Sequence, residues 1–84
     1  MNTIIEFEDI SREEVIRRGI EWAGDRFTGT KEHAIKLAVA YARHHAITIN
    51  GKKYDDCHKG LNRPDHREVQ KVFNSYLRAH WKLY

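Results

Sequence analysis

The basic residues toward the C-terminal end have the types and spacing to bind an anionic partner. A helix over residues 65–82 would place four of them one turn apart on one stripe, over roughly 22 Å at 1.5 Å rise per residue: Arg67, Lys71, Arg78 and Lys82. No acidic residue shares this stripe. Lysine and arginine bind phosphates with an affinity that falls steeply with salt and carries little sequence selectivity. Arg63 precedes the helix, and a secondary basic patch would consist of Lys52, Lys53 and Lys59.

The charge of the chain is distributed unevenly. Residues 1–14 carry one basic and five acidic side chains, net −4; residues 15–50 carry six and three, net +3; residues 51–84 carry eight and four, net +4. The basic half would steer the molecule toward polyanions, or the two halves would pair between copies. We therefore predict a non-enzymatic binding protein whose last helix contacts a nucleic acid or a nucleic-acid-handling complex. The other interpretation of the stripe is a solvated face that serves solubility.

Six histidines and a single cysteine raise the question of metal chemistry. Zinc prefers four nitrogen or sulfur ligands, and the candidates for such a site are Cys57, His58, His66, His44 and His45. A metal nuclease of the His-Asn-His type is a sharper variant with two candidate triples: His45, Asn62 and His66, or His58, Asn74 and His80. Neither the zinc candidates nor the triples have the spacing of a known site of their kind. We predict no metal site and no cofactor.

Other catalytic arrangements are weaker still. Asp55 and Asp56 form a pair of acids, but neighbouring residues at the end of a strand point apart. The sequence has no P-loop, no Gly-x-Ser-x-Gly motif and no dinucleotide-binding fingerprint, and 84 residues are too few to enclose a substrate cleft. We predict that the protein is not an enzyme and has no catalytic residue.

A protein-binding function is the alternative. Tyr, Trp and Arg anchor protein interfaces, and the chain has a large set of such aromatic side chains: Trp22, Tyr41, Tyr54, Tyr76, Trp81 and Tyr84. Segment 79–84 carries so much aromatic area that it must dock onto the domain or onto a partner. Small proteins without catalytic apparatus include inhibitors and adaptors of phages and mobile elements that act on host proteins. This analogy rests on size, not on a motif.

The clearest helix signal, among the elements that must position these residues, covers residues 30–45. Thr30 can accept a hydrogen bond from the first free backbone amides, and good helix formers follow it. Three alanines one turn apart form a low ridge against which another helix can pack closely: Ala34, Ala38 and Ala42. We expect this helix at the centre of the fold.

A hairpin is predicted directly after it, over residues 46–55. The run Ala46-Ile47-Thr48-Ile49 suits a strand, and Asn50-Gly51 supplies the two positive φ angles of a tight turn. The returning strand would be Lys52, Lys53 and Tyr54. Because an isolated hairpin is marginal in water, we expect a third strand from residues 3–8.

The first helix is predicted over residues 11–26. Ser11 and Glu14 form a capping box, and Ile10 stands at the spacing of a hydrophobic staple with Val15. Gly19 falls inside this helix, where it costs roughly 1 kcal/mol relative to alanine unless a neighbour packs against it.

The last helix, over residues 65–82, carries a second capping box. Asp65 and Glu68 stand at the required spacing just after Pro64. Its apolar stripe, with His80 expected as a core histidine, consists of Val69, Val72, Phe73, Tyr76, Leu77, His80, Trp81 and Tyr84.

Half of the chain loosely resembles the ribbon-helix-helix repressors. The resemblance lies in strand 3–8, helix 11–24 and helix 30–45 with its entry Gly29-Thr30-Lys31-Glu32-His33-Ala34-Ile35. That family pairs its strands in a dimer and reads DNA with them. Here the strand would present Glu6 and Glu8, or Ile5 and Phe7, which repel or ignore phosphates. We do not carry the resemblance into the prediction.

Length and composition set the outer bounds. The chain of 84 residues predicts one α+β domain, residues 1–84, with three helices and a small antiparallel sheet. The single Cys57 excludes an internal disulfide and fits a reducing compartment. No apolar stretch approaches 18 residues, and the acidic start lacks the pattern of a signal peptide. We expect a cytoplasmic protein with no membrane partner; the sequence leaves the oligomeric state open, a homodimer included.

Overall fold

The Asn50-Gly51 turn joins two strands of a three-stranded antiparallel sheet. In the computed structural model, which describes residues 4–83 without the side chain of His58, β2 (Ile47–Ile49) lies between β3 (Lys52–Lys53) and β1 (Ile5–Phe7). Asn50 and Gly51 have φ angles of 53° and 84°, as the predicted turn requires. The predicted α+β class, the hairpin and the third strand are confirmed; Thr3, the first residue of the expected strand, lies outside the described residues.

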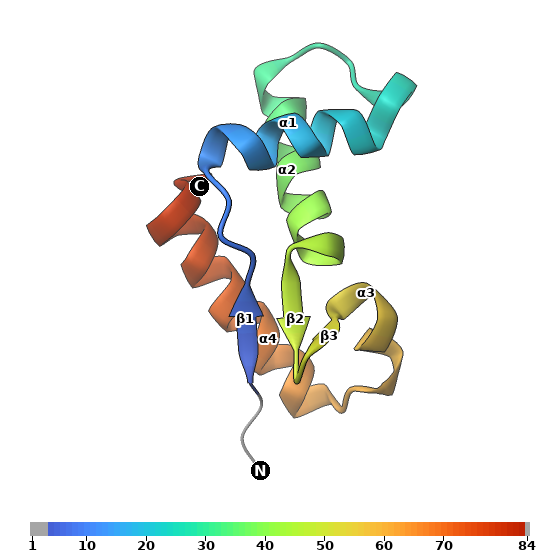
Figure 1. The fold of residues 1–84 in the computed structure, drawn as a ribbon, viewed down its shortest axis with the longest axis vertical. Helices are drawn as coiled ribbons and strands as arrows, with labels where there is room; N and C mark the ends of the chain where they lie inside the picture. Colours follow the sequence, from blue (N-terminus) through green and yellow to red (C-terminus); the bar gives the residue numbers. More distant parts are fainter. Residues whose placement is uncertain (1–3, 84) are drawn as a thin grey trace.

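The helices follow the predicted order. They are α1 (Arg12–Ala23), α2 (Lys31–His45), α3 (Tyr54–Cys57) and α4 (Arg63–Tyr76), with the short turns η1 (Gly24–Arg26), η2 (His58–Gly60) and η3 (Leu77–Trp81). Figure 1 shows α1 crossing α2 at one end of an elongated molecule of 42 × 25 × 20 Å, with the sheet, α3 and α4 toward the other end. None of the helices in the described part of the chain is both long enough and apolar enough for a membrane crossing.

The α1–α2 crossing depends on a glycine. Ser11 caps α1 by accepting a hydrogen bond from the backbone N–H of Glu14 at 3.1 Å, which confirms the predicted start. A Cβ atom built on Gly19 would lie 2.8 Å from the backbone nitrogen of Ala38. Gly19 therefore packs against the alanine ridge of α2, with the two helix backbones almost in contact. This close packing explains why a glycine stands inside α1.

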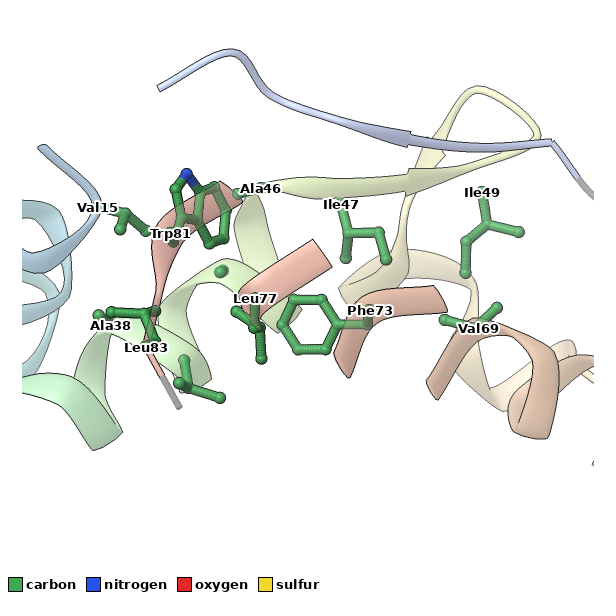
Figure 2. Packing of buried hydrophobic residues seen from close by; sticks show 12 residues of the cluster. Val15, Ala38, Ala46, Ile47, Ile49, Val69, Phe73, Leu77, Trp81 and Leu83 are labelled. Atoms are coloured by element: carbon green, nitrogen blue, oxygen red, sulfur yellow. The ribbon is translucent and has the colours of Figure 1, made fainter. Parts of the chain in front are cut away.

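The core lies between the sheet and α4, and continues beneath α1 and α2. Ile47 and Ile49 point from β2 toward Phe73 and Val69 of α4 (Figure 2). Ile5 and Phe7 stand opposite Ile49 and Ile47 in the register, so they share this inner face. The outer face of the sheet carries the alternate residues of the three strands: Glu6, Thr48 and Lys53.

The start of the last helix differs from the prediction. Asn62 is the N-cap residue, although its side chain makes no capping bond, and Asp65 lies inside the first turn. The predicted capping box of Asp65 and Glu68 is therefore wrong. The reason is Pro64, whose fixed φ suits the first turn of a helix and so moves the start ahead of it.

The end of the last helix also differs. Regular α-helix stops at Tyr76, η3 is a π-helical turn, and Lys82 follows it in the left-handed region with φ 52°. The buried residues recur every four positions: Val69, Phe73, Leu77 and Trp81. Four residues overshoot an α-helical turn by about 40°, and the wider turn brings Trp81 back over the face of Leu77. Tyr84 of the predicted stripe lies outside the described residues.

The returning strand is shorter than predicted, because Tyr54 begins α3. This short helix is held from two sides. The Tyr54 hydroxyl hydrogen-bonds His66 Nδ1 on α4 at 3.1 Å, and Asp55 Oδ1 lies 2.8 Å from His44 Nδ1 on α2. Tertiary contacts with α2 and α4 thus replace the strand pairing of Tyr54.

Candidate nucleic-acid interface

Three of the predicted binding residues lie on one side of α4. Arg63, Arg67 and Lys71 follow one another at four-residue steps, and all three are exposed. Together with Pro64 and Glu68 they line an open hollow of about 500 Å³. Because residues four apart are neighbours on a helix surface, these three cations lie next to one another, with one carboxylate, that of Glu68, in the same hollow.

The other two predicted residues lie past the regular helix. Arg78 is exposed within the wide turn η3, and Lys82 is exposed at the left-handed position after it. The single straight stripe expected over residues 65–82 is therefore wrong at its C-terminal end. We use the name basic face for the set Arg63, Arg67, Lys71, Arg78 and Lys82.

The cations of the basic face have no acidic partner among the described residues. Among residues 4–83, no carboxylate lies within 4.0 Å of any of them. Two arginines of α1 are different: Arg17 pairs with Glu14 and Glu21, and Arg18 pairs with Glu14 and with Glu8 at 2.8 Å. The charges of Arg17 and Arg18 are thus neutralised within the molecule, whereas the exposed cations of the basic face are directed at solvent.

The α1 ion-pair cluster makes the stability of the protein depend on pH. Hydrogen bonds from Arg17, and next from Arg18, lower the pKa of the partly exposed Glu14 carboxyl from 4.5 to about 2. A carboxyl with a depressed folded-state pKa stabilises the fold above its unfolded pKa, and this contribution disappears as the pH falls through the folded value. We expect the stability difference between the wild type and Glu14→Gln to be largest near neutral pH and to shrink between pH 4.5 and about 2.

Chemical denaturation at a series of pH values measures this difference. Glu13→Gln is the matched control, because Glu13 lies in the same first turn and makes no ion pair in the described structure. Its difference from the wild type should vary little over this range. A Glu14→Gln difference that stays constant from neutral pH to pH 2 would contradict the assignment.

Lys53 of the secondary basic patch does not join the basic face. Lys53 stands beside Thr48 and Glu6 on the outer face of the sheet, away from α4. There it lines a separate hollow of about 390 Å³ that also contains Glu8 and His45. Lys52 is exposed on the edge strand β3, and Lys59 is exposed in η2. The predicted grouping of Lys53 with Lys52 in one patch is wrong, because strand alternation turns the side chains of these two neighbours to opposite sides of the sheet.

An aromatic stack borders the basic face and was not predicted as part of it. The ring of Tyr76 lies between Phe7, at 3.9 Å between centroids and 4° between planes, and His80, at 4.2 Å and 22°. His80 is exposed, so its expected place in the core is wrong; the π-helical turn carries it past the buried face. Burial, with a smaller effect of Asp9, raises the pKa of Tyr76, whose ring stays uncharged. The feature of the sequence that could have indicated this stack is the four-residue step from Tyr76 to His80, which makes the two rings neighbours on a helix surface.

A third hollow, of about 250 Å³, adjoins this stack. Its lining is mainly apolar and comes from β1, α4 and η3: Phe7, Val72, Ser75, Tyr76, Ala79 and His80. Ser75 lies one helical turn from Lys71 on one side and from Arg78 on the other. The aromatic hollow and the basic face are therefore neighbouring parts of one surface.

The residues proposed for metal binding serve other contacts. His66 hydrogen-bonds Tyr54, His44 pairs with Asp55, and His80 stacks on Tyr76. Leaving aside the undescribed side chain of His58, residues 4–83 contain no group of three or more His, Cys, Asp or Glu side chains arranged to hold a metal ion.

A different aromatic group lies over α1 and α2. Trp22 is 36% exposed, and the Arg26 guanidinium lies 5.1 Å from its ring centroid. The other rings near Trp22 belong to α2: Tyr41, His44 and His45. We call this group the Trp22 cluster.

Comparison of the chain with protein-family models, with curated proteins and with solved structures gave no match.

Proposed function

We propose that this protein binds nucleic acid, or a complex that handles nucleic acid, through the basic face of α4. The observation that supports this proposal is the contrast between the two charged helices. Arg17 and Arg18 on α1 are neutralised by carboxylates, whereas the five cations of the basic face have none in the described structure. Unpaired arginines and lysines at one-turn spacing are suited to successive phosphates.

The contacts would be to the backbone and largely independent of sequence. Each phosphate that is neutralised releases counterions, so the logarithm of the binding constant falls linearly with the logarithm of salt concentration. Five contacts predict a slope of about −3.5 to −4.5. The binding would require no chemical step, and we propose a non-enzymatic role in the cytoplasm, where a free Cys57 fits the reducing conditions.

Reversing two charges of the basic face tests the proposal. We expect the double variant Lys71→Glu, Arg78→Glu to abolish binding to a labelled oligonucleotide, because two attractive contacts become repulsive. The melting temperature should stay near that of the wild type, since both side chains are exposed and unpaired in the described structure. Fluorescence anisotropy and thermal melting measure the two quantities.

The matched control reverses two exposed lysines of α2. The double variant Lys31→Glu, Lys36→Glu changes the net charge by the same amount but lies away from α4. It should retain most of the binding. If the α4 pair leaves binding unchanged, or if both pairs weaken it equally, a specific basic face is ruled out.

A protein partner is the second candidate, and the exposed Trp22 cluster favours it. Solvent-accessible Trp, Tyr and Arg side chains are typical anchors of protein interfaces. In this case the protein would act as an inhibitor or adaptor on a host protein complex. Affinity purification with and without nuclease treatment discriminates the two functions: a nucleic-acid-mediated partner disappears after nuclease, whereas a direct protein complex persists and tolerates salt.

A further inference from the structure

The aromatic stack of Phe7, Tyr76 and His80 has one open end. Phe7 covers one face of the Tyr76 ring and His80 covers the other. Phe7 and Tyr76 are partly buried against the core, whereas His80 is exposed. The ring available for a further planar group is therefore His80, at the edge of the 250 Å³ hollow that Val72 and Ala79 also line.

The position of this stack relative to the cations restricts the planar group. Ser75 lines the hollow, and Lys71 and Arg78 each lie one helical turn from Ser75, on either side of it. A ligand seated there would place a flat apolar group against His80 and negative charges against the two cations. A nucleotide within a single strand has both parts, because its base is planar and its phosphates lie on either side along the backbone.

We propose that the nucleic acid bound by this protein is single-stranded, with its backbone on the basic face and one base stacked on His80. This inference rests on the proposed function and specifies its partner. In a duplex the bases are already stacked and paired, so the hollow would stay empty and only the phosphate contacts would remain. Stacking accepts any base, which agrees with the absence of a cluster suited to base readout.

Three probes of equal length test the inference. They are a labelled oligothymidylate of about 12 nucleotides, the same strand with abasic sites in place of every base, and the corresponding duplex. One base stacked on an aromatic ring predicts binding of the oligothymidylate about tenfold tighter than that of the abasic strand. The His80→Ala variant should lose about this factor for the oligothymidylate and keep its affinity for the abasic strand.

Two further variants control for indirect effects. His80→Trp restores a stacking ring and should retain or raise the affinity for the oligothymidylate. Trp22→Ala removes an exposed ring whose described ring contacts are in η1 and α2, and should leave all three affinities unchanged. Unchanged melting temperatures would show that the exposed His80 can be replaced without disturbing the fold.

The results separate this inference from the proposed function. If the three probes bind equally, or if His80→Ala has no effect, the single-strand inference is wrong; the proposed function then stands as long as Lys71→Glu, Arg78→Glu still abolishes binding. If none of the probes binds the wild type, the single-strand inference and direct binding of nucleic acid by the basic face are both overturned. Tighter binding of the oligothymidylate than of the abasic strand supports the inference if this difference is lost in His80→Ala and restored in His80→Trp.

Discussion

Replacing Trp81 with alanine is expected to destabilise the fold by about 3–5 kcal/mol, the usual range for removing a fully buried large aromatic side chain. Trp81 is 1% exposed and packs edge-on against Tyr76, with 5.0 Å between ring centroids. Its indole Nε1 donates a hydrogen bond to the backbone oxygen of Ile10 at 2.9 Å. The substitution therefore opens a cavity and also leaves that oxygen without its partner.

The expected loss of stability in Trp81→Ala is large relative to the total stability of a domain. Native domains are stable by about 5–15 kcal/mol, so Trp81→Ala should leave a marginal protein. The Nε1 bond joins residues 71 positions apart, the end of the last helix and the entry to α1. The variant therefore lacks the side-chain bond that joins these two ends.

Urea denaturation followed by fluorescence measures this effect, and Trp22→Ala is the control. Trp22 is 36% exposed and should cost much less, so the two tryptophans differ in burial but not in type. Each variant keeps the other tryptophan as a probe. If the two variants lose the same free energy of unfolding, Trp81 does not hold the C-terminal turn as described.

Substituting Gly19 with alanine is expected to destabilise the protein by about 2 kcal/mol, against the direction of helix propensity. Propensity alone would favour alanine by roughly 1 kcal/mol. The added Cβ, however, would lie 2.8 Å from the backbone nitrogen of Ala38 and 2.8 Å from the backbone carbon of Leu37. Because both atoms are backbone, α1 must move away from α2, and overpacking of this kind costs about 1–3 kcal/mol or more.

Thermal melting measures the effect, which should lower the melting temperature by about 10 °C in a domain of this size. Gly60→Ala is the control. A Cβ added at Gly60 would meet no described atom within 4 Å, and Gly60 has no positive φ, so this substitution should be neutral or slightly stabilising. A Gly19→Ala variant that is more stable than the wild type would show that the helices separate at no cost.

The elements that the sequence predicted well are those whose determinants are local. Ser11 satisfies the N–H of Glu14 three residues away, and Thr30 likewise caps α2 through the N–H of His33. The Asn50-Gly51 turn needs two positive φ angles and nothing from the rest of the chain. Such signals are legible because both partners stand within a few residues of each other.

The errors occurred where contacts distant in sequence decide the local structure. Tyr54 left the predicted strand because of its bond to His66 on α4. The last helix widened at Leu77 because Trp81 had to reach Ile10 and the core beneath α1. Periodicity assumes a uniform 3.6-residue turn, so it assigned His80 to the core and extended the basic stripe in a straight line to Lys82.

The candidate site also has features that local spacing predicts and features that depend on contacts between distant segments. Arg67 and Lys71 were predicted from residue types and spacing to share one side of the last helix, whereas Arg63 was expected before the helix and joins this side because α4 begins at Arg63. That the cations of the basic face have no carboxylate within reach in the described structure, while Arg17 and Arg18 of α1 do, depends on which elements become neighbours. The same is true of the aromatic stack, where Phe7 of β1 meets Tyr76 at the end of α4.

By itself the sequence determined the α+β class, the order of the helices, the hairpin turn and the presence of a basic helical surface. These follow from caps, turn residues and side-chain period, which act over a few residues. Only the tertiary structure decided the close crossing at Gly19, the wide turn at Leu77–Trp81 and the ring of His80 beside the cations. Each of these depends on backbone or side-chain contacts between segments far apart in the chain, and no local pattern encodes such a contact.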